Sequence, residues 1–164
     1  MPELIPPTTA LHAQWLVAHR EWGPGSHEDG FGLLPIDRPE TAAGFAAWIA
    51  RLEAGSQHCT YRWIVEGSEV LGGIALRHEL SGAVASMGHI GYGIRPSARR
   101  RGLGGWALTR MLAHARDELG LDRVLLVCLA DNTASARLIE RHGGVLDTPP
   151  DVVRRYWITL SPLR

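Results

Sequence analysis

The chain has 164 residues, 45% of them hydrophobic, which suits one domain with a substantial core and excludes a disordered protein. Its 17 basic and 17 acidic residues cancel, which disfavours duplex binding because such domains usually carry a strong basic excess. Two cysteines are too few for a disulfide framework, residues 1–15 lack the pattern of a secretory signal, and no apolar stretch is long enough to span a bilayer. We expect a single, soluble, cytoplasmic domain over residues 1–164 that binds neither nucleic acid nor membrane.

The first third of the chain predicts a short strand and two helices separated by a long loop. Residues 3–7 can form the strand, and residues 8–22 place apolar side chains at helical spacing after a threonine cap. The loop at residues 23–39 is rich in glycine and proline and is too long for a simple connection. Residues 40–55 predict a second amphipathic helix that stops at a glycine.

The middle of the chain predicts three strands and a helix. Residues 60–65 and 70–80 flank a turn and form a hairpin. Residues 87–94 predict a third strand, which ends before Pro96 because the residue preceding a proline avoids helical conformation. Apolar residues at helical spacing then predict a helix that begins near 102–104 and ends at Gly120.

The last part of the chain predicts a buried strand, a short helix and two closing strands. Residues 122–129 are continuously apolar, as expected for a strand covered on both faces. Residues 131–144 predict the helix, and residues 144–147 and 152–160 the closing strands, whose exposed edge leaves room for a homodimer. The order of elements predicts an α/β (α+β) fold, with a mixed sheet and helices on both faces.

The stretch RRRGLGG, residues 99–105, lies between a predicted strand and a predicted helix. The first turn of a helix presents unpaired N–H groups and a partial positive charge, and glycines let a pyrophosphate approach that backbone. The stretch is not a P-loop, because Lys-Ser/Thr is missing, and it is not the dinucleotide fingerprint. It is therefore either a solvated turn or a phosphate site.

Residues 99–104 match the (Gln/Arg)-x-x-Gly-x-(Gly/Ala) signature of the GNAT superfamily of acyl-CoA-dependent N-acyltransferases, and residues 132–143 resemble its second motif, Asn-x-x-(Ser/Ala)-x-x-x-Tyr-Glu-x-x-Gly. The order of elements matches that of the family over essentially the whole chain. The sequence also resembles a group of bacterial predicted acetyltransferases. The resemblance implies a GNAT-like, mostly antiparallel sheet of six to seven strands, whose central strands are splayed apart by acetyl-CoA.

The resemblance also implies which residues bind acetyl-CoA. The pantetheine arm pairs with the strand before the glycine stretch, and the pyrophosphate sits on the amides of the stretch itself with the arginine side chains nearby. Asn132 and Ser135 match positions that contact the pantetheine arm, although both also suit the cap and the third position of a helix. The implied set is Tyr92, Ile94, Arg99, Arg100, Arg101, Gly102, Leu103, Gly104, Gly105, Asn132 and Ser135.

The implied reaction moves an acetyl group from acetyl-CoA to a primary amine of a small molecule, by direct attack through a tetrahedral intermediate. Two alternatives are a protein N-acetyltransferase and a non-catalytic acyl-CoA-binding or sensor module. The second alternative is encouraged by Ile139, which stands where the family has its tyrosine acid. A thiol with a pKa of about 8.5 leaves fairly well as thiolate, so this loss slows turnover without forbidding it.

The amine must lose a proton before it attacks, since a lysine-like amine has a pKa of about 10.4. Candidate bases are Glu79, with its neighbour His78, and His89; each also suits a structural or solvated role. Alternation places His89 opposite Tyr92, so it serves only from the other face or across a bulge. Tyr92 and Tyr156 are substitute acids that also suit a strand core.

The long loop covers the acceptor side in this family. His27, Glu28, Asp29 and Phe31 make the loop acidic and aromatic, which suits a cationic amine, and a polar surface loop is the alternative. The eight histidines form no ligand pair at i, i+4 beside a carboxylate, so we expect no metal site.

Overall fold

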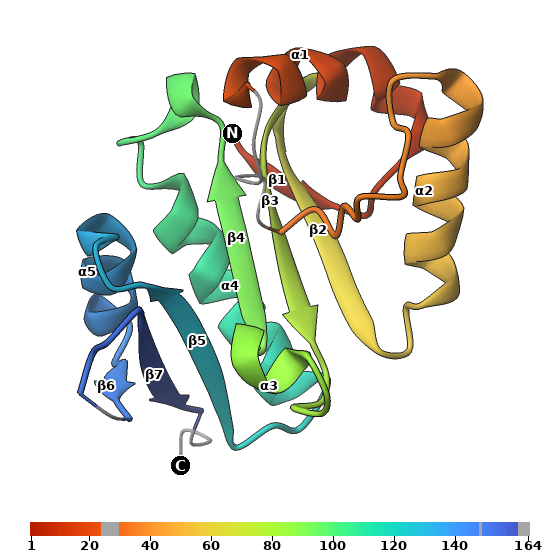
Figure 1. Ribbon diagram of the computed structural model, residues 1–164. Helices are drawn as coiled ribbons and strands as arrows, with labels where there is room; N and C mark the ends of the chain where they lie inside the picture. The colour runs from red at the N-terminus through yellow and green to blue at the C-terminus, as the bar shows by residue number, and fades with distance from the viewer. Residues whose placement is uncertain (24–29, 148, 161–164) are drawn as a thin grey trace.

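The computed structural model describes residues 1–23, 30–147 and 149–160. One seven-stranded sheet with the order β1-β2-β3-β4-β5-β7-β6 forms its centre (Figure 1). The strands are β1 (Glu3–Ile5), β2 (Cys59–Glu66), β3 (Glu69–Arg77), β4 (Ile90–Ile94), β5 (Arg123–Leu129), β6 (Val145–Leu146) and β7 (Val153–Thr159). The helices are α1 (His12–Trp22), α2 (Ala42–Ala54), α3 (Val84–Met87), α4 (Leu103–Asp117) and α5 (Thr133–Arg141), with 3-10 turns η1 (Thr9–Leu11) and η2 (Pro96–Ala98).

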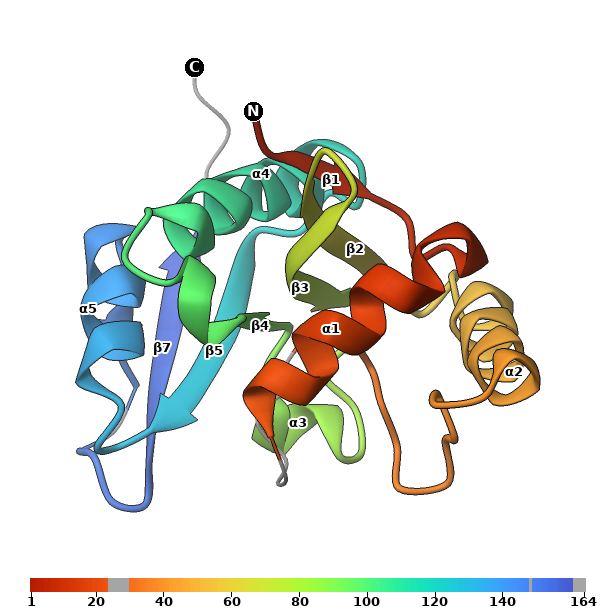
Figure 2. The same ribbon diagram turned by 90° about the horizontal axis from the view of Figure 1, so that it is seen from above.

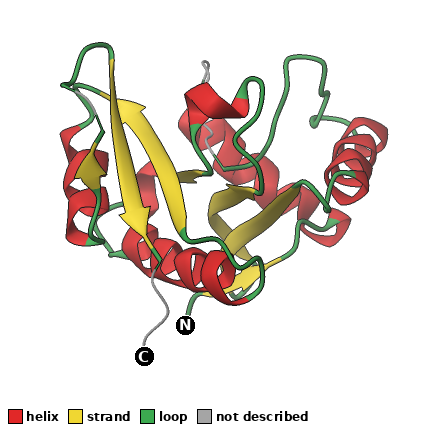
Figure 3. Ribbon diagram, turned by 90° about the horizontal axis from the view of Figure 1, so that it is seen from below, coloured by secondary structure: helices red, strands yellow, loops and turns green. Residues whose placement is uncertain are grey.

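The sheet is mixed and mostly antiparallel, as predicted. Every pairing is antiparallel except that of β4 with β5. Helices α1 and α2 lie on one side of the sheet and α4 and α5 on the other (Figure 2), and helices also flank the strands in the view from below (Figure 3). The fold class expected from the element order is therefore confirmed.

An aromatic core joins α1 and α2 to β2. Trp15, Phe45, Trp48 and Trp63 are each at most 1% exposed, and their rings lie 4.8–6.1 Å apart. Phe31 belongs to the same core, with 1% of its surface exposed.

The burial of Phe31 corrects the expectation that it belongs to an aromatic surface loop. Gly30, at φ 88°, lies so close to the carbonyl of Gly73 that no Cβ would fit, so the loop backbone rests directly on β3. This approach places Phe31 beneath the loop. His27, Glu28 and Asp29, the polar residues predicted for the same loop, lie outside the described residues.

A second core lies between the other face of the sheet and α4. Leu108, Met111 and Ala115 form the buried stripe of α4, as the helical spacing predicted. They pack against alternate residues of the sheet, including Ile74 and Leu76 of β3. The two cores use opposite faces of β3, which therefore holds both helix layers in place.

The segment before β4 differs from the prediction. The expected strand over residues 87–94 begins only at Ile90, and residues 84–87 form the short helix α3. Gly88 has φ 82°, which turns the chain out of strand conformation. A Cβ at this position would approach the carbonyl of Leu125 to 2.7 Å, so glycine also permits close contact with β5.

Candidate functional site

A cleft of about 1220 Å³ passes between β4 and β5. The two strands run parallel and share one ladder pair, Ile90 with Leu126, before they separate (Figure 1). The cleft is lined by β4, β5, the turn before α4, and α5, with Trp22, Arg77 and Met87 from the opposite side of the sheet. Its volume exceeds that of an ordinary small-ligand pocket, which suits a long ligand.

The register of β4 directs part of its backbone into the cleft. Arg77 N–H donates to the carbonyl of His89 at 2.6 Å, and Arg95 N–H donates to that of Leu71 at 2.8 Å. Hydrogen-bonded pairs alternate along an antiparallel ladder, so the odd-numbered residues of β4 bond to β3. The backbone groups of Tyr92 and Ile94 therefore face β5 across the gap. These are the two residues that the resemblance implicated in pantetheine binding.

The glycine stretch forms a tight turn at one end of the cleft. Arg100, with φ 63°, is the one non-glycine residue with positive φ among the described residues, and Gly102 has φ 76°. The helix α4 begins directly afterwards and has no side-chain cap or acidic residue in its first turn. Its first N–H groups are therefore available to an anion.

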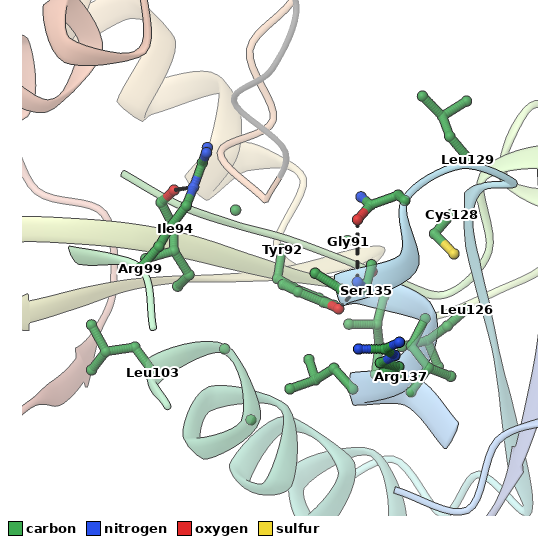
Figure 4. A pocket seen from close by; sticks show the side chains of 18 of the residues that line it. Gly91, Tyr92, Ile94, Arg99, Leu103, Leu126, Cys128, Leu129, Ser135 and Arg137 are labelled. Atoms are coloured by element: carbon green, nitrogen blue, oxygen red, sulfur yellow. Dashed lines mark hydrogen bonds between the residues drawn. The ribbon is translucent and has the colours of Figure 1, made fainter. Parts of the chain in front are cut away.

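The three arginines of the stretch have different partners. Arg99 lines the cleft and its Nε donates to the carbonyl of Ile94 at 3.0 Å (Figure 4). Arg100 also lines the cleft. Arg101 instead donates to Glu66 at 2.9 Å and is not among the lining residues, so its predicted ligand contact has no direct geometric support.

The start of α5 supplies polar groups to the cleft. Asn132 accepts from Ser135 N–H at 3.2 Å and so caps the helix. The hydroxyl of Ser135 lies 2.7 Å from that of Tyr92 (Figure 4). Both α5 residues line the cleft, so the capping role and the cleft position predicted for them occur together. Ile139 lies one turn beyond Ser135, is 1% exposed, and borders the cleft with its aliphatic chain.

His89 lies at the point where β4 and β5 part. Its backbone N–H donates to Leu125 O at 2.7 Å, and its Nδ1 accepts from Leu125 N–H at 2.9 Å. Its ring is buried, meets Trp157 edge-on at 6.4 Å, and is not among the residues lining the cleft. Burial lowers the pKa of His89, which favours the neutral ring that this hydrogen bond requires. The geometry fits an anchor between strands.

The other predicted acid–base residues lie outside the cleft lining, apart from Tyr92. Glu79 is exposed and lies two residues beyond the end of β3, because the strand predicted over residues 70–80 stops at Arg77. Both ring nitrogens of His78 are engaged, with Thr60 Oγ1 at 2.8 Å and Gln57 O at 2.9 Å. Tyr156 is buried and donates to Glu140 at 2.9 Å. Of the three residues in the predicted catalytic set, Tyr92 alone borders the cleft in the described structure.

Two further residues of the cleft were not singled out from the sequence. Cys128 lies near the end of β5, and burial raises the pKa of its thiol. Arg77 ends β3 and reaches the cleft from the opposite face of the sheet. Side chains alternate between the two faces of a strand, so Arg77 shares a face of β3 with Gly73. The sequence does not specify which neighbouring strand its side chain contacts.

The charged side chains among the described cleft residues are all arginines. They are Arg77, Arg99, Arg100, Arg137 and Arg141. A cleft of this charge suits a ligand that carries several phosphates. Across the described ranges, no cluster of three or more His, Cys, Asp or Glu side chains is placed to hold a metal ion. In the same residues, no helix combines the length and apolar character needed to cross a membrane.

Comparison with known proteins gives one family and a shared fold. A family model for the acetyltransferase (GNAT) domain matches residues 4–145. A mycothiol acetyltransferase of Salinispora tropica is 30% identical over 135 residues, which cover 82% of this chain and 39% of that protein. The chain therefore spans about two fifths of the length of this curated relative.

Solved structures share the architecture at low sequence identity. Mycobacterium smegmatis RimJ in complex with CoA-disulfide has a TM-score of 0.73 at 18% identity, over 96% of this chain and 81% of that one. The microcin C7 self-immunity acetyltransferase MccE, in complex with acetyl-CoA and AMP, has a TM-score of 0.70 at 12% identity, over 96% and 92%. At these identities the likeness establishes the fold.

Proposed function

The chain belongs to the GNAT family of acetyltransferases, and from this premise we propose that it transfers an acetyl group from acetyl-CoA to a primary amine of a small molecule. The observation that carries the proposal is the gap between β4 and β5, into which Tyr92 and Ile94 direct backbone groups. A pantetheine arm needs such groups along its length, and a pyrophosphate needs amides and cations at one end. The cleft offers both in that order.

The donor side of the cleft fits acetyl-CoA. The amides from Arg100 to Gly105 begin a helix and are proposed to hold the pyrophosphate, with the side chains of Arg99 and Arg100 beside it. Asn132 and Ser135 are proposed to contact the pantetheine arm. Arg101 is assigned an indirect role, because its ion pair with Glu66 joins the turn to β2.

The chemistry requires a neutral amine, which attacks the thioester carbonyl carbon to form a tetrahedral intermediate. The carbon–sulfur bond breaks when this intermediate collapses, and CoA leaves as the thiolate or thiol. Among the residues that the structure describes, those lining the cleft include no carboxylate or imidazole. We propose that a water molecule takes the amine proton. The hydroxyl of Tyr92 borders the cleft beside Ser135. We assign to it the proton that the departing CoA sulfur takes up, a role that Ile139 cannot perform.

The proposal of a small-molecule acceptor is supported by a relative of the chain and not by the donor side of the cleft. The Salinispora tropica relative is a mycothiol acetyltransferase, which favours a small-molecule acceptor over a protein terminus. The buried Ile139 favours a second candidate, an acyl-CoA-binding module without turnover. Tyr92 weighs against that candidate, because it returns a proton donor to the cleft.

We further propose that residues 1–164 act as one acetyltransferase domain in the cytoplasm, where the free thiols of Cys59 and Cys128 stay reduced. A homodimer through the edge strand β6 is proposed because Val145 and Leu146 are 68% and 40% exposed there.

The test combines turnover with donor binding. The 164-residue chain is mixed with acetyl-CoA and a panel of amines that includes an N-terminal peptide, and free CoA is measured. Release with small amines is expected; release with the peptide alone would move the acceptor to proteins, and tight binding without release would support the module.

The donor site is tested by two substitutions at one position. A Cβ on Gly104 meets Leu138, Tyr92 and Ile94 at 3.7–3.9 Å, which is ordinary contact, so Gly104→Ala fits the fold. Gly104→Glu adds bulk and a negative charge where the donor is expected. Calorimetry should show acetyl-CoA affinity within a few-fold of the parent for Gly104→Ala and loss of binding for Gly104→Glu. Equal affinity of Gly104→Glu and the parent would refute the donor site.

A further inference from the structure

Arg77 lies at the end of the cleft that is remote from the glycine turn. It is the last residue of β3 and stands beside Gly91, three residues before Ile94 on β4. At about 3.3 Å per residue, the two ends of this segment lie about 10 Å apart. The other four arginines of the cleft belong to the glycine turn and to α5. Arg77 is thus separated from the residues proposed for the phosphates.

The guanidinium of Arg77 rests over a part of β4 that carries no side chain. A Cβ on Gly91 would lie 3.3 Å from Nη2 and 3.5 Å from Nη1 of Arg77. Gly93, two residues along, faces the same side of the strand, and both glycines line the cleft. Trp22 and Met87 line the same side of the cleft, with an indole and a thioether chain.

The charge of Arg77 is not neutralised within the described part of the chain. Nη1 donates to the carbonyl of Gly88 at 3.2 Å, and no carboxylate of the described residues lies within ion-pair distance. Cys59, directly across from Arg77 on β2, and Tyr61 are uncharged near neutral pH, because burial raises the pKa of both. A half-buried guanidinium with one carbonyl partner keeps hydrogen-bond donors for an anion.

We propose that Arg77 selects acceptors that carry an anionic group, a carboxylate or a phosphate, close to the amine that is acetylated. The proposal rests on the proposed acetyl transfer and specifies its acceptor. A guanidinium edge can hold a carboxylate or a phosphate through two parallel N–H···O bonds, which fixes the neighbouring amine near Gly91. A second ammonium group at this place is disfavoured by like-charge repulsion, so diamines are poor acceptors.

The test compares acceptors that differ in one charge. The protein is assayed with α-amino acids against the corresponding α-amides, with O-phosphoethanolamine against ethanolamine, and with diamines. If Arg77 binds the anionic group, kcat/KM should be about tenfold to a hundredfold higher for the anionic member of at least one pair than for its neutral partner. This is the range expected for a charge-assisted hydrogen bond. The carboxylate and phosphate arms identify which anion is preferred.

Substitutions assign this preference to Arg77. Arg77→Gln should remove most of the advantage of the anionic acceptor and change the rate with neutral amines by less than about threefold, whereas Arg77→Glu should favour diamines. Arg62→Gln is the matched control, because Arg62 lies on β2 with its side chain on the opposite face and donates to a backbone carbonyl. Acetyl-CoA affinity, measured by calorimetry, shows that each variant retains its fold.

Three results would overturn the inference. Equal turnover of charged and neutral partners by the parent refutes selection by Arg77 and leaves acetyl transfer intact. A uniform loss of rate over all acceptors in Arg77→Gln would instead assign the residue to the chemical step and also refute selection. Absence of turnover with every amine removes the proposed function and the inference together.

Discussion

Tyr92 carries the one phenolic hydroxyl on the described wall of the cleft. It extends from β4 across to Ser135 on α5, where the two oxygens lie 2.7 Å apart. Ile139, one turn further along α5, occupies the position of the usual acid with a buried aliphatic chain. The proton donor is thus assigned to strand β4, whereas the family motif places it on helix α5.

We expect Tyr92→Phe to lower kcat by about tenfold or more, since a positioned acid contributes up to a few orders of magnitude and a thiolate leaves readily without one. The KM for acetyl-CoA should change little, because the backbone groups of Tyr92 remain. Steady-state kinetics with Tyr156→Phe as control measures both, as Tyr156 lies outside the cleft lining. Full activity of Tyr92→Phe would exclude the assignment.

The position of His89 on its strand could be predicted from the sequence, but its contacts could not. Alternation predicted its position opposite Tyr92, but its partners, Leu125 and Trp157, lie 36 and 68 residues away along the chain. Their proximity depends on how β4 meets β5 and β7, which no local pattern encodes. The same holds for Arg101 and its ion pair with Glu66. The donor turn was predictable because its glycines and helix start are local.

At the scale of elements, α1 is tied at its C-terminal end to the turn after β4. Glu21 accepts from Arg95 Nε and Nη2, each at 3.2 Å, and from Ser97 N–H at 2.9 Å. Arg95 directly follows β4, and Ser97 lies in η2, which leads into the glycine turn. These contacts join the helix on the Arg77 side of the sheet to the proposed phosphate site.

The contacts of Glu21 give the fold a dependence on acid. Hydrogen bonding to Arg95 lowers the pKa of Glu21 from 4.5 to about 2. A carboxylate with a lowered pKa stabilises the folded chain at neutral pH, and this contribution is lost as the pH falls from about 4.5 to about 2. Glu21→Gln should lower the free energy of unfolding at pH 7 by about 1 kcal/mol, because the pair is partly solvated, and the difference should vanish near pH 2.

Urea unfolding between pH 2 and pH 7 measures this difference. Glu53→Gln on α2 is the control, because Glu53 is exposed and has no side-chain partner among the described interactions. A destabilisation of Glu21→Gln that stays constant over the whole pH range would contradict the ionic origin.

The longer elements follow from the sequence, whereas the short ones do not. Helical spacing predicted α1, α2, α4 and α5, since each contains at least two turns of amphipathic pattern. The four residues of α3 are too few to show a period. The start of β4 shifted to Ile90 because Gly88 adopts a positive φ, which glycine allows but does not require.

At the scale of the whole molecule, the cleft separates two parts of one sheet. Strands β1 to β4 pair in sequence order, β5 pairs with β7, and a single ladder pair joins the two groups. A ligand that fills the gap contacts both groups at once. Ligand binding should therefore stabilise the molecule well beyond the residues it touches.

We expect acetyl-CoA at about 100 times its Kd to raise the free energy of unfolding by about 2.7 kcal/mol. Hydrogen exchange should slow most at Tyr92, Ile94 and the amides of Arg100 to Gly105, because these face the ligand. Exchange measured by mass spectrometry with and without acetyl-CoA tests the placement. Protection that appears elsewhere and spares these peptides would place the donor in another site.

The separation of β4 from β5 also bears on solubility. A strand that lacks a neighbour on one side offers a template on which a strand of another molecule can assemble, and proteins usually shield such edges. Here two of them lie inside the sheet, along the cleft. A ligand in the cleft covers these edges. Purified protein stripped of CoA is therefore expected to aggregate on storage sooner than the protein with CoA bound, as light scattering would measure.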